Sequence, residues 1–245
     1  MLNLIDTAPE SRARQTGWRI ELQNVSKEYA GVHGTKKRVI DRISHVIEYG
    51  SNLGILGVNG AGKSTLMRLL AGIEVPTTGR IRRYGTVSWP LARNAGFVSQ
   101  MTGEQNVRFV GRLYRMDLKE LMEFVRDFSE LGSALKEPVE TYSSGMKARL
   151  QFAMSMGVPF NFYLVDEIVA VGDQRFQEKC RRVFAERRGN ATVVMISHQI
   201  STLRQFCDKG ALLQNGMLQS FDTLEAAILA YRDTQYDQMR RQRAL

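Results

Sequence analysis

The sequence predicts an α/β fold, a parallel sheet with a helical segment inserted into it, and three observations support this prediction. A glycine-rich loop stands between a strand-like run, Ser51–Leu56, and an apolar run at helical spacing, Thr65–Ala71. Residues 103–157 carry apolar side chains at helical spacing with charged residues between them. Buried-strand runs and helical segments then alternate along the rest of the chain, an order that favours a parallel sheet.

The N-terminal part predicts β-structure after a polar start. Residues 1–17 are polar, and we expect them to form a flexible extension. Trp18–Val25 alternates roughly between apolar and polar side chains, and Val39–Ile47 is rich in β-branched residues. Because Gly31–Lys37 between them has the composition of a hairpin loop, we expect an antiparallel β subdomain. A turn and a further short strand follow at Pro76–Gly79 and Arg80–Tyr84.

The remaining elements follow from apolar periodicity. The helical insert is expected to hold helices over Glu104–Tyr114, Leu118–Gly132 and Gly145–Met156. Strands are expected after it at Asn161–Val165, Thr192–Ile196, Ala211–Leu213 and Met217–Phe221, and helices at Gln174–Arg188, Ser201–Phe206 and Leu224–Tyr236. We therefore expect one domain over residues 18–236, with a helical subdomain at about 97–158, and a basic tail at 237–245.

Composition limits the class of protein. Every hydrophobic run is interrupted by charges or glycines before it reaches 18 residues, so no membrane span is expected, and the N-terminus lacks the apolar core of a secretory signal. Cys180 and Cys207 have no metal-like spacing, which favours a reduced, cytosolic chain. The net charge of +9 suits nucleic acid, anionic lipid or an acidic polymer without choosing among them. Solvated faces are the commoner role of the basic clusters at Arg80–Arg83, Lys179–Arg182 and Arg240–Arg243.

Gly57–Ser64 fits the phosphate-loop pattern G-x-x-x-x-G-K-[ST] at every defined position. Glycines let backbone N–H groups surround a polyphosphate, Lys63 supplies a positive charge for its β- and γ-phosphates, and the Ser64 hydroxyl can ligate Mg²⁺. The alternative is a glycine-rich turn that binds nothing. The strand before the loop and the helix after it, whose N-terminus attracts anions, favour the phosphate site.

Two carboxylates end the apolar run that begins at Asn161. Asp166 can hold the hydration shell of Mg²⁺, and Glu167 can accept a proton from an attacking water. The alternative is a surface Asp-Glu turn after a buried strand. We favour the functional interpretation because a phosphate loop needs such a partner at the edge of the sheet.

Three further features have both a structural and a functional interpretation. Ser143–Gly145 precede an amphipathic helix, where they can act as an N-cap or present N–H groups to an anion. His198 follows a buried strand and could sense a γ-phosphate, although a lone histidine is more often structural. Tyr29 could stack on a purine or simply pack against the surface.

Taken in chain order, these motifs resemble the nucleotide-binding subunit of ATP-binding cassette (ABC) transporters over about residues 18–235. The resemblance implies a P-loop NTPase fold of the RecA type, with ATP and Mg²⁺ bound and ATP hydrolysed. It implies that Tyr29 stacks on adenine, that Tyr163–Glu167 end the Walker B strand, and that His198 is the switch histidine. Gln100, the only candidate in the loop at 96–103, would be the Q-loop residue near the metal. Val171–Asp173 would be the D-loop. The Walker A loop would comprise Gly57, Val58, Asn59, Gly60, Ala61, Gly62, Lys63, Ser64 and Thr65, and the signature that acts on the ATP of a second copy would comprise Ser143, Ser144, Gly145 and Met146.

Departures from the common motifs are similar to those of one group of these ATPases. Tyr-Ser-Ser-Gly-Met replaces Leu-Ser-Gly-Gly-Gln, and Asp-Glu-Ile replaces Asp-Glu-Pro. Together with the sequences at 87–91, 102–107 and 165–173, these departures resemble the ATPases that export capsular polysaccharide from Gram-negative bacteria.

This narrower resemblance implies a homodimer on the cytoplasmic face of the inner membrane. A transmembrane permease would dock near residues 97–112, contact the polysaccharide and lead to periplasmic and outer-membrane partners; no nucleic acid is expected. The alternatives are a soluble ABC ATPase acting on nucleic acid or ribosomes, and a regulatory protein that binds ATP without turnover. A GTPase is disfavoured because the chain has no Asn-Lys-x-Asp motif.

Overall fold

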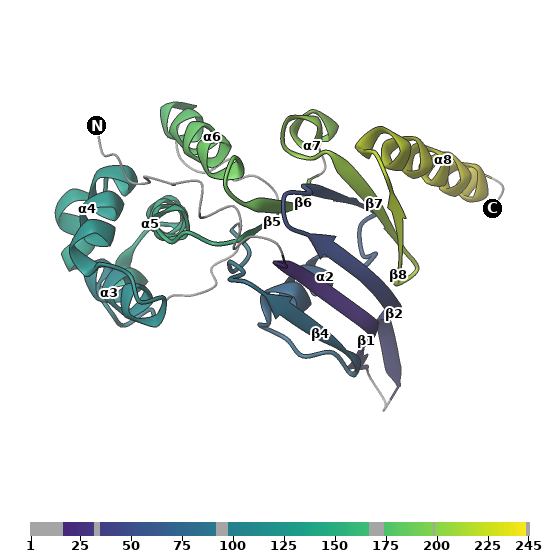
Figure 1. Cartoon of the computed structure of the whole chain (residues 1–245), viewed down its shortest axis with the longest axis horizontal. Helices are drawn as coiled ribbons and strands as arrows, with labels where there is room; N and C mark the ends of the chain where they lie inside the picture. Colours follow the sequence, from purple (N-terminus) through teal and green to yellow (C-terminus); the bar gives the residue numbers. More distant parts are fainter. Residues whose placement is uncertain (1–16, 32–34, 92–97, 167–173, 198, 244–245) are drawn as a thin grey trace.

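Two sheets and a separate group of helices make up the protein (Figure 1). The structure, a computed structural model, describes residues 17–31, 35–91, 98–166, 174–197 and 199–243. Within them, three strands form a sheet in the order β2-β1-β4, and five form a second sheet in the order β5-β6-β3-β7-β8. The expected combination of a parallel core, an antiparallel β subdomain and a helical insert is confirmed.

The antiparallel sheet contains β1 (Arg19–Ala30), β2 (Lys36–Glu48) and β4 (Thr78–Tyr84). β1 pairs with both neighbours, and it runs five residues further than the sequence pattern predicts. The reason lies in its register, which shifts between Leu22 and Val25 and again before Glu28. Such bulges interrupt the alternation of side chains, so the pattern stops at Val25 while the strand continues.

β3 (Leu53–Leu56) lies at the centre of the second sheet, between β6 (Thr192–Ile196) and β7 (Lys209–Gln214). β5 (Phe162–Asp166) adds to β6, and these pairings are all parallel. β8 (Met217–Phe221) closes the other edge by pairing antiparallel with β7. Every residue of β3 and β6 is buried, as expected for strands covered on both faces.

The two faces of this sheet belong to two different cores, because side chains alternate along each strand. Phe162 and Leu164 pack with the antiparallel sheet and with α2 (Lys63–Ala71), which lies between the two sheets. Tyr163 and Val165 face the other core. That core contains α6 (Gln174–Arg188), α7 (Ile200–Phe206) and α8 (Leu224–Arg243), which cover this face in Figure 1.

The helical subdomain lies beside the sheets, at the left of Figure 1. It comprises α3 (Gly103–Leu113), α4 (Leu118–Ser129) and α5 (Ser144–Gly157), with 3-10 turns at Gly132–Lys136 and Val139–Thr141. The side chains of Thr102, Asp117 and Ser143 cap the three helices. These caps explain why the helices begin where the sequence predicts, within a residue or two.

Two further segments also differ from the sequence expectation. Val87–Leu91 runs along β5, where Ser88 N donates to Phe162 O and Leu91 N donates to Leu164 O. The sequence did not predict this pairing because Trp-Pro in the segment is untypical of a strand. The predicted end of the last helix at Tyr236 was wrong, since α8 continues to Arg243 through residues that favour helix. Among the described residues, no helix is both long and apolar enough to cross a bilayer.

Candidate active site

The glycine loop connects β3 to α2, and the surrounding backbone requires glycine at several of its positions. A Cβ atom at Gly57 would lie 2.5 Å from the carbonyl oxygen of Leu213 in β7. Gly60 and Gly62 have φ angles of +79° and +104°, which side chains rarely tolerate. A Cβ at Gly60 would enter open space, while one at Gly62 would meet Val39 O at 2.9 Å. The loop can therefore present its backbone N–H groups without side chains covering them.

α2 begins without a cap from its own sequence. Its N-cap is Gly62, no side chain accepts from its first N–H groups, and its first turn carries no acidic residue. α3, α4 and α5 differ because each has a side-chain cap. Lys63 Nζ donates to the carbonyl oxygens of Gly57 at 2.5 Å and Val58 at 3.0 Å, so its charge lies over the loop. The N-terminus of α2 and the charge of Lys63 together favour the binding of a polyanion.

Asp166 lies at the same end of the parallel strands as the glycine loop, the carboxyl-terminal end. The register pairs both Ile55 of β3 and Asp166 of β5 with Ile196 of β6. Only β6 separates the two strands, so the Cα atoms of Ile55 and Asp166 are about 10 Å apart, two strand spacings. The carboxyl ends of the three strands thus bring the loop, Asp166 and the residues after Ile196 to one edge, where α/β sheets bind ligands.

The residues present fit a magnesium-bound triphosphate. The loop offers a glycine cradle that Cβ atoms would fill or distort, and Lys63 supplies a positive charge. Ser64 and Asp166 bear oxygen atoms, which are the donors that Mg²⁺ prefers. No cluster of three or more histidine, cysteine or acidic side chains occurs in the described part of the chain. A Mg²⁺ ion held by Ser64 and Asp166 would also take oxygen ligands from phosphate and water, as Mg²⁺ commonly does.

The signature residues begin α5, in the helical subdomain. Ser143 is the N-cap, and its Oγ accepts a hydrogen bond from Met146 N at 3.2 Å. Gly145 has open space beside it, because a Cβ there would have its nearest neighbour 3.9 Å away. Tyr142 is buried, and its hydroxyl donates to Ala134 O. The predicted N-cap is confirmed, while the proposed action of these residues on a second copy stays a prediction.

Gln100 lies on the surface in the turn before α3. No hydrogen bond joins it to Asp166 or to the glycine loop in the part of the chain that the structure describes, so its metal role stays a prediction. Asn106, which the sequence analysis did not single out, is fully buried and holds this turn. Its side chain accepts from Val98 N at 2.9 Å and donates to the carbonyl oxygens of Val98, Met101 and Thr102. A polar residue on the apolar stripe of a predicted helix was the available signal.

Tyr29 lies next to the last residue of the Walker A loop. Its hydroxyl is 3.5 Å from Thr65 Oγ1, and it donates to Glu74, which follows α2. The structure thus places the Tyr29 hydroxyl beside Thr65, and the base-stacking role of its ring stays a prediction. Three predicted groups, namely Glu167, Asp173 of the D-loop and His198, lie outside the described residues.

The glycine loop and the acidic strand end define a P-loop protein that binds a nucleoside triphosphate. A family model described as ABC transporter matches residues 40–170, and the chain belongs to this family. It is 45% identical over 216 residues to ATP-binding protein BexA of Haemophilus influenzae, covering 88% of this chain and 99% of that one. It is also 45% identical to the capsule polysaccharide export ATP-binding protein CtrD of Neisseria meningitidis, covering 86% and 98%. Identity to the polysialic acid transport ATP-binding protein KpsT of Escherichia coli is 40%, covering 87% and 96%.

Solved structures share the fold. The dimeric ATP-binding cassette MJ0796 bound to ADP and phosphate has a TM-score of 0.69 at 19% identity, over 83% of this chain and 98% of that one. An ATP-binding subunit of an ABC transporter has a TM-score of 0.71 at 18% identity, over 87% and 99%. These likenesses confirm the predicted ABC ATPase fold.

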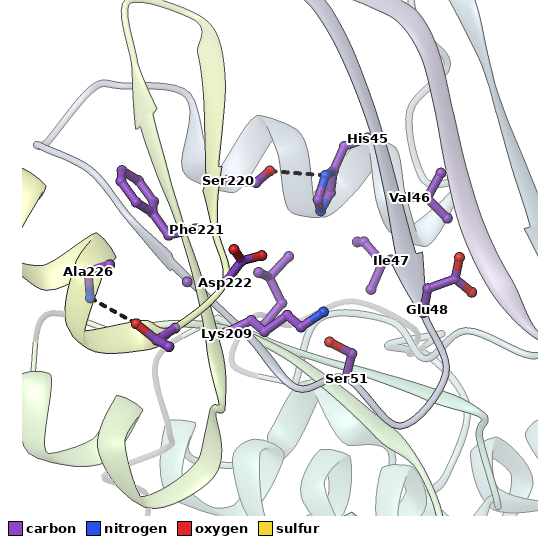
Figure 2. Close-up of a pocket in the computed structure, with 13 residues that line it drawn as sticks. His45, Val46, Ile47, Glu48, Ser51, Lys209, Ser220, Phe221, Asp222 and Ala226 are labelled. Carbon is purple, nitrogen blue, oxygen red and sulfur yellow. Dashed lines mark hydrogen bonds between the residues drawn. The ribbon is translucent and has the colours of Figure 1, made fainter.

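A hollow lies at the opposite end of the parallel strands from the glycine loop, where β3 and β7 begin. It measures about 410 Å³, and none of the residues predicted to bind nucleotide lines it. His45 and Ser220 point toward each other here, with 3.1 Å between Nδ1 and Oγ (Figure 2). Burial, and secondly the positive charge of Lys209, lower the pKa of His45. This histidine is therefore expected to be neutral at physiological pH.

Proposed function

We propose that this chain is the ATP-hydrolysing subunit of an ABC transporter that exports capsular or related cell-surface polysaccharide. The observation that carries the proposal is the site at one sheet edge, where the uncapped start of α2, Lys63 and Asp166 come together. The names of the three relatives support export of a polysaccharide over the nucleic-acid alternative.

In the proposed reaction, the chain binds and polarises ATP through its own residues. The N–H groups of the loop and Lys63 hold the β- and γ-phosphates and offset the charge that develops there. Ser64 and Asp166 would hold Mg²⁺, which would supply positive charge to offset the charge of the phosphates. Glu167 accepts a proton from the attacking water, and His198 and Gln100 orient the γ-phosphate and that water. Tyr29 stacks on the adenine.

A second copy of the chain completes the site in this proposal. Ser143–Gly145 of one protomer would face the ATP held by the other, with the D-loop residue Asp173 near the same junction. The open space beside Gly145 supports this arrangement, since a phosphate can approach the backbone there. The dimer seen for the cassette of similar fold supports two-fold pairing as well.

The surface of α3 is the proposed docking site for a membrane permease. Phe109 and Leu113, one helical turn apart, are 47% and 63% exposed. Arg108 and Arg112 are exposed on the same helix. An apolar patch with a basic rim is typical of a protein interface, so this surface would receive a cytoplasmic segment of the permease.

In this proposal, the protein would lie on the cytoplasmic face of the inner membrane. It would be held there by the permease, which would contact the polysaccharide and lead to partners in the periplasm and outer membrane. The basic stretch after Tyr236 would have no role as a lipid anchor.

The test is ATP hydrolysis by the chain reconstituted with its permease in liposomes. We expect Glu167→Gln to bind ATP but to lose turnover by about 10²–10⁴-fold, because general-base help is removed. Lys63→Ala should lose ATP binding as well. Arg204→Ala, which removes an exposed ion pair between α7 and α8, serves as the control and should keep turnover. Full turnover in Glu167→Gln would contradict the assigned mechanism, and no turnover in the wild-type complex would contradict the function.

A further inference from the structure

The hydroxyl of Tyr29 is held by a network that reaches from β1 to both ends of α2. It donates to Glu74 Oε2 at 2.5 Å and accepts from Arg68 Nη2 at 3.2 Å. Arg68 Nη2 also donates to Thr65 Oγ1 at 3.2 Å, and Arg68 Nε donates to Glu74 Oε1 at 2.5 Å. Glu74 therefore binds Tyr29 and Arg68 with its two oxygens, and Arg68 connects them to Thr65 in the first turn of α2.

Lys27 completes the network at one face of the Tyr29 ring. Its Nζ lies 5.2 Å from the centroid of the Tyr29 ring and 3.5 Å from Glu74 Oε2, and it donates to Val75 O at 2.9 Å. One face of the ring is thus covered by an ammonium group, which leaves the opposite face as the one on which a base could stack. With the hydroxyl and one face both held, the orientation of the ring is defined.

Glu74 is ionised in this setting. Burial raises the pKa of its carboxyl, but hydrogen bonds from Tyr29 and Arg68 and the charges of Arg68 and Lys27 outweigh burial, so the pKa lies below its ordinary value. The Glu74 side chain is only 23% exposed. A charged acceptor shielded from water makes stronger hydrogen bonds than a surface carboxylate does.

We propose that Glu74 is a positioning residue for the adenine base: it holds Tyr29 in the stacking orientation and ties that ring to the helix that begins in the glycine loop. The proposal rests on the base-stacking role of Tyr29 in the proposed function. Glu74 itself touches no substrate, so its effect is transmitted through the ring. Preordering the ring reduces the entropy lost on binding, which strengthens binding of the base.

The test measures binding of Mg-ATP and of inorganic tripolyphosphate to the full-length chain by calorimetry. Tyr29→Ala should weaken ATP by roughly tenfold or more, the range found for loss of one aromatic stacking partner. Glu74→Ala, and Tyr29→Phe, which keeps the ring but loses the hydroxyl, should each weaken ATP by about three- to tenfold. Tripolyphosphate, which has no base, should bind all variants equally.

A double-variant cycle separates positioning from a purely structural brace. If Glu74 acts through Tyr29, adding Glu74→Ala to Tyr29→Ala should cause no further loss of ATP binding. Glu225→Ala is the matched control, because it removes a carboxylate that binds an arginine, Arg204, on the other side of the sheet. It should leave ATP binding unchanged.

Three results would overturn the proposal. They are unchanged ATP binding in Glu74→Ala, an additive loss in the double variant, and a matching loss of tripolyphosphate binding, which would place the effect in the glycine loop. Unchanged ATP binding in Tyr29→Ala would overturn it too. That result would leave the ATPase assignment intact, since the assignment is tested separately by turnover of the wild-type complex.

Discussion

The carbonyl oxygen of Leu213 in β7 lies where it would be only 2.5 Å from a Cβ atom at Gly57, the first residue of the glycine loop. The backbone of β7 thus restricts the conformation of the loop whether or not a phosphate is bound. The loop leaves β3 against the backbone of β7, and only glycine fits there without a backbone shift. The first glycine of the phosphate-loop pattern therefore has a structural role in addition to its chemical one.

We predict that Gly57→Ala lowers the free energy of unfolding by about 1–3 kcal/mol, because the added methyl group overlaps a backbone oxygen that cannot rotate away. Thermal unfolding followed by circular dichroism measures the change. Gly189→Ala is the control, since its Cβ would have its nearest neighbour 3.4 Å away. Equal melting temperatures of the two variants would contradict the prediction.

Gly145→Ala should separate stability from turnover. The Cβ meets nothing closer than 3.9 Å and φ is not positive, so the free energy of unfolding should stay equal or rise by up to about 1 kcal/mol. Turnover of the reconstituted transporter should nevertheless fall about ten- to hundredfold, because the methyl group would displace the partner's ATP from the signature. Unchanged turnover would indicate that this helix start does not approach nucleotide.

His45 should make stability depend on pH. Its pKa is lowered by burial and by Lys209, whereas in the unfolded chain it is about 6.5. Between these values the unfolded chain binds a proton that the folded chain does not, so stability rises with pH across this window. The contribution is fully present above the unfolded pKa and decreases as pH falls below it.

The measurement for His45 is the melting temperature from about pH 7.5 down to about pH 5.5. The wild type should lose more than His45→Gln, which keeps a polar group facing Ser220. His33 and His198 are present in both proteins, so their contributions cancel in the comparison. Parallel curves for the two proteins would exclude His45 as the source.

Cys180 should be unreactive in the folded protein. Burial raises the pKa of its thiol to about 12, and the charges of Lys179 and Arg149 offset this only in part. At pH 8, roughly one thiol in ten thousand would be ionised, and the thiolate is the reactive form. In Cys207→Ser, where Cys180 is the single cysteine, a disulfide reagent should label the chain only after guanidinium is added. Rapid labelling without denaturant would show that α6 opens.

Elements whose signal is local were predicted well from the sequence. β6 and α6 have the predicted bounds, because continuous apolar runs and helical spacing need no knowledge of neighbouring segments. The bounds of β1 and the pairing of Val87–Leu91 were missed, since bulges and a proline break the period on which such predictions depend.

In the candidate site, too, features with a local sequence signal could be predicted and contacts between distant segments could not. The glycine loop and Asp166 could be predicted because each motif is continuous in the chain. The partners Leu213 for Gly57 and Glu74 for Tyr29 could not, because they depend on contacts between segments far apart in the sequence. The packing of Asn106 beneath the turn of Gln100 likewise became evident only from the buried hydrogen bonds.

The helical subdomain is joined to the rest of the molecule beside a single strand. The incoming chain is hydrogen-bonded along β5 up to Leu91, and the outgoing chain returns at Asn161, whose N–H donates to Thr86 O, directly before β5. Both described attachments therefore lie along the strand that ends in Asp166, so the helical subdomain is anchored next to that carboxylate.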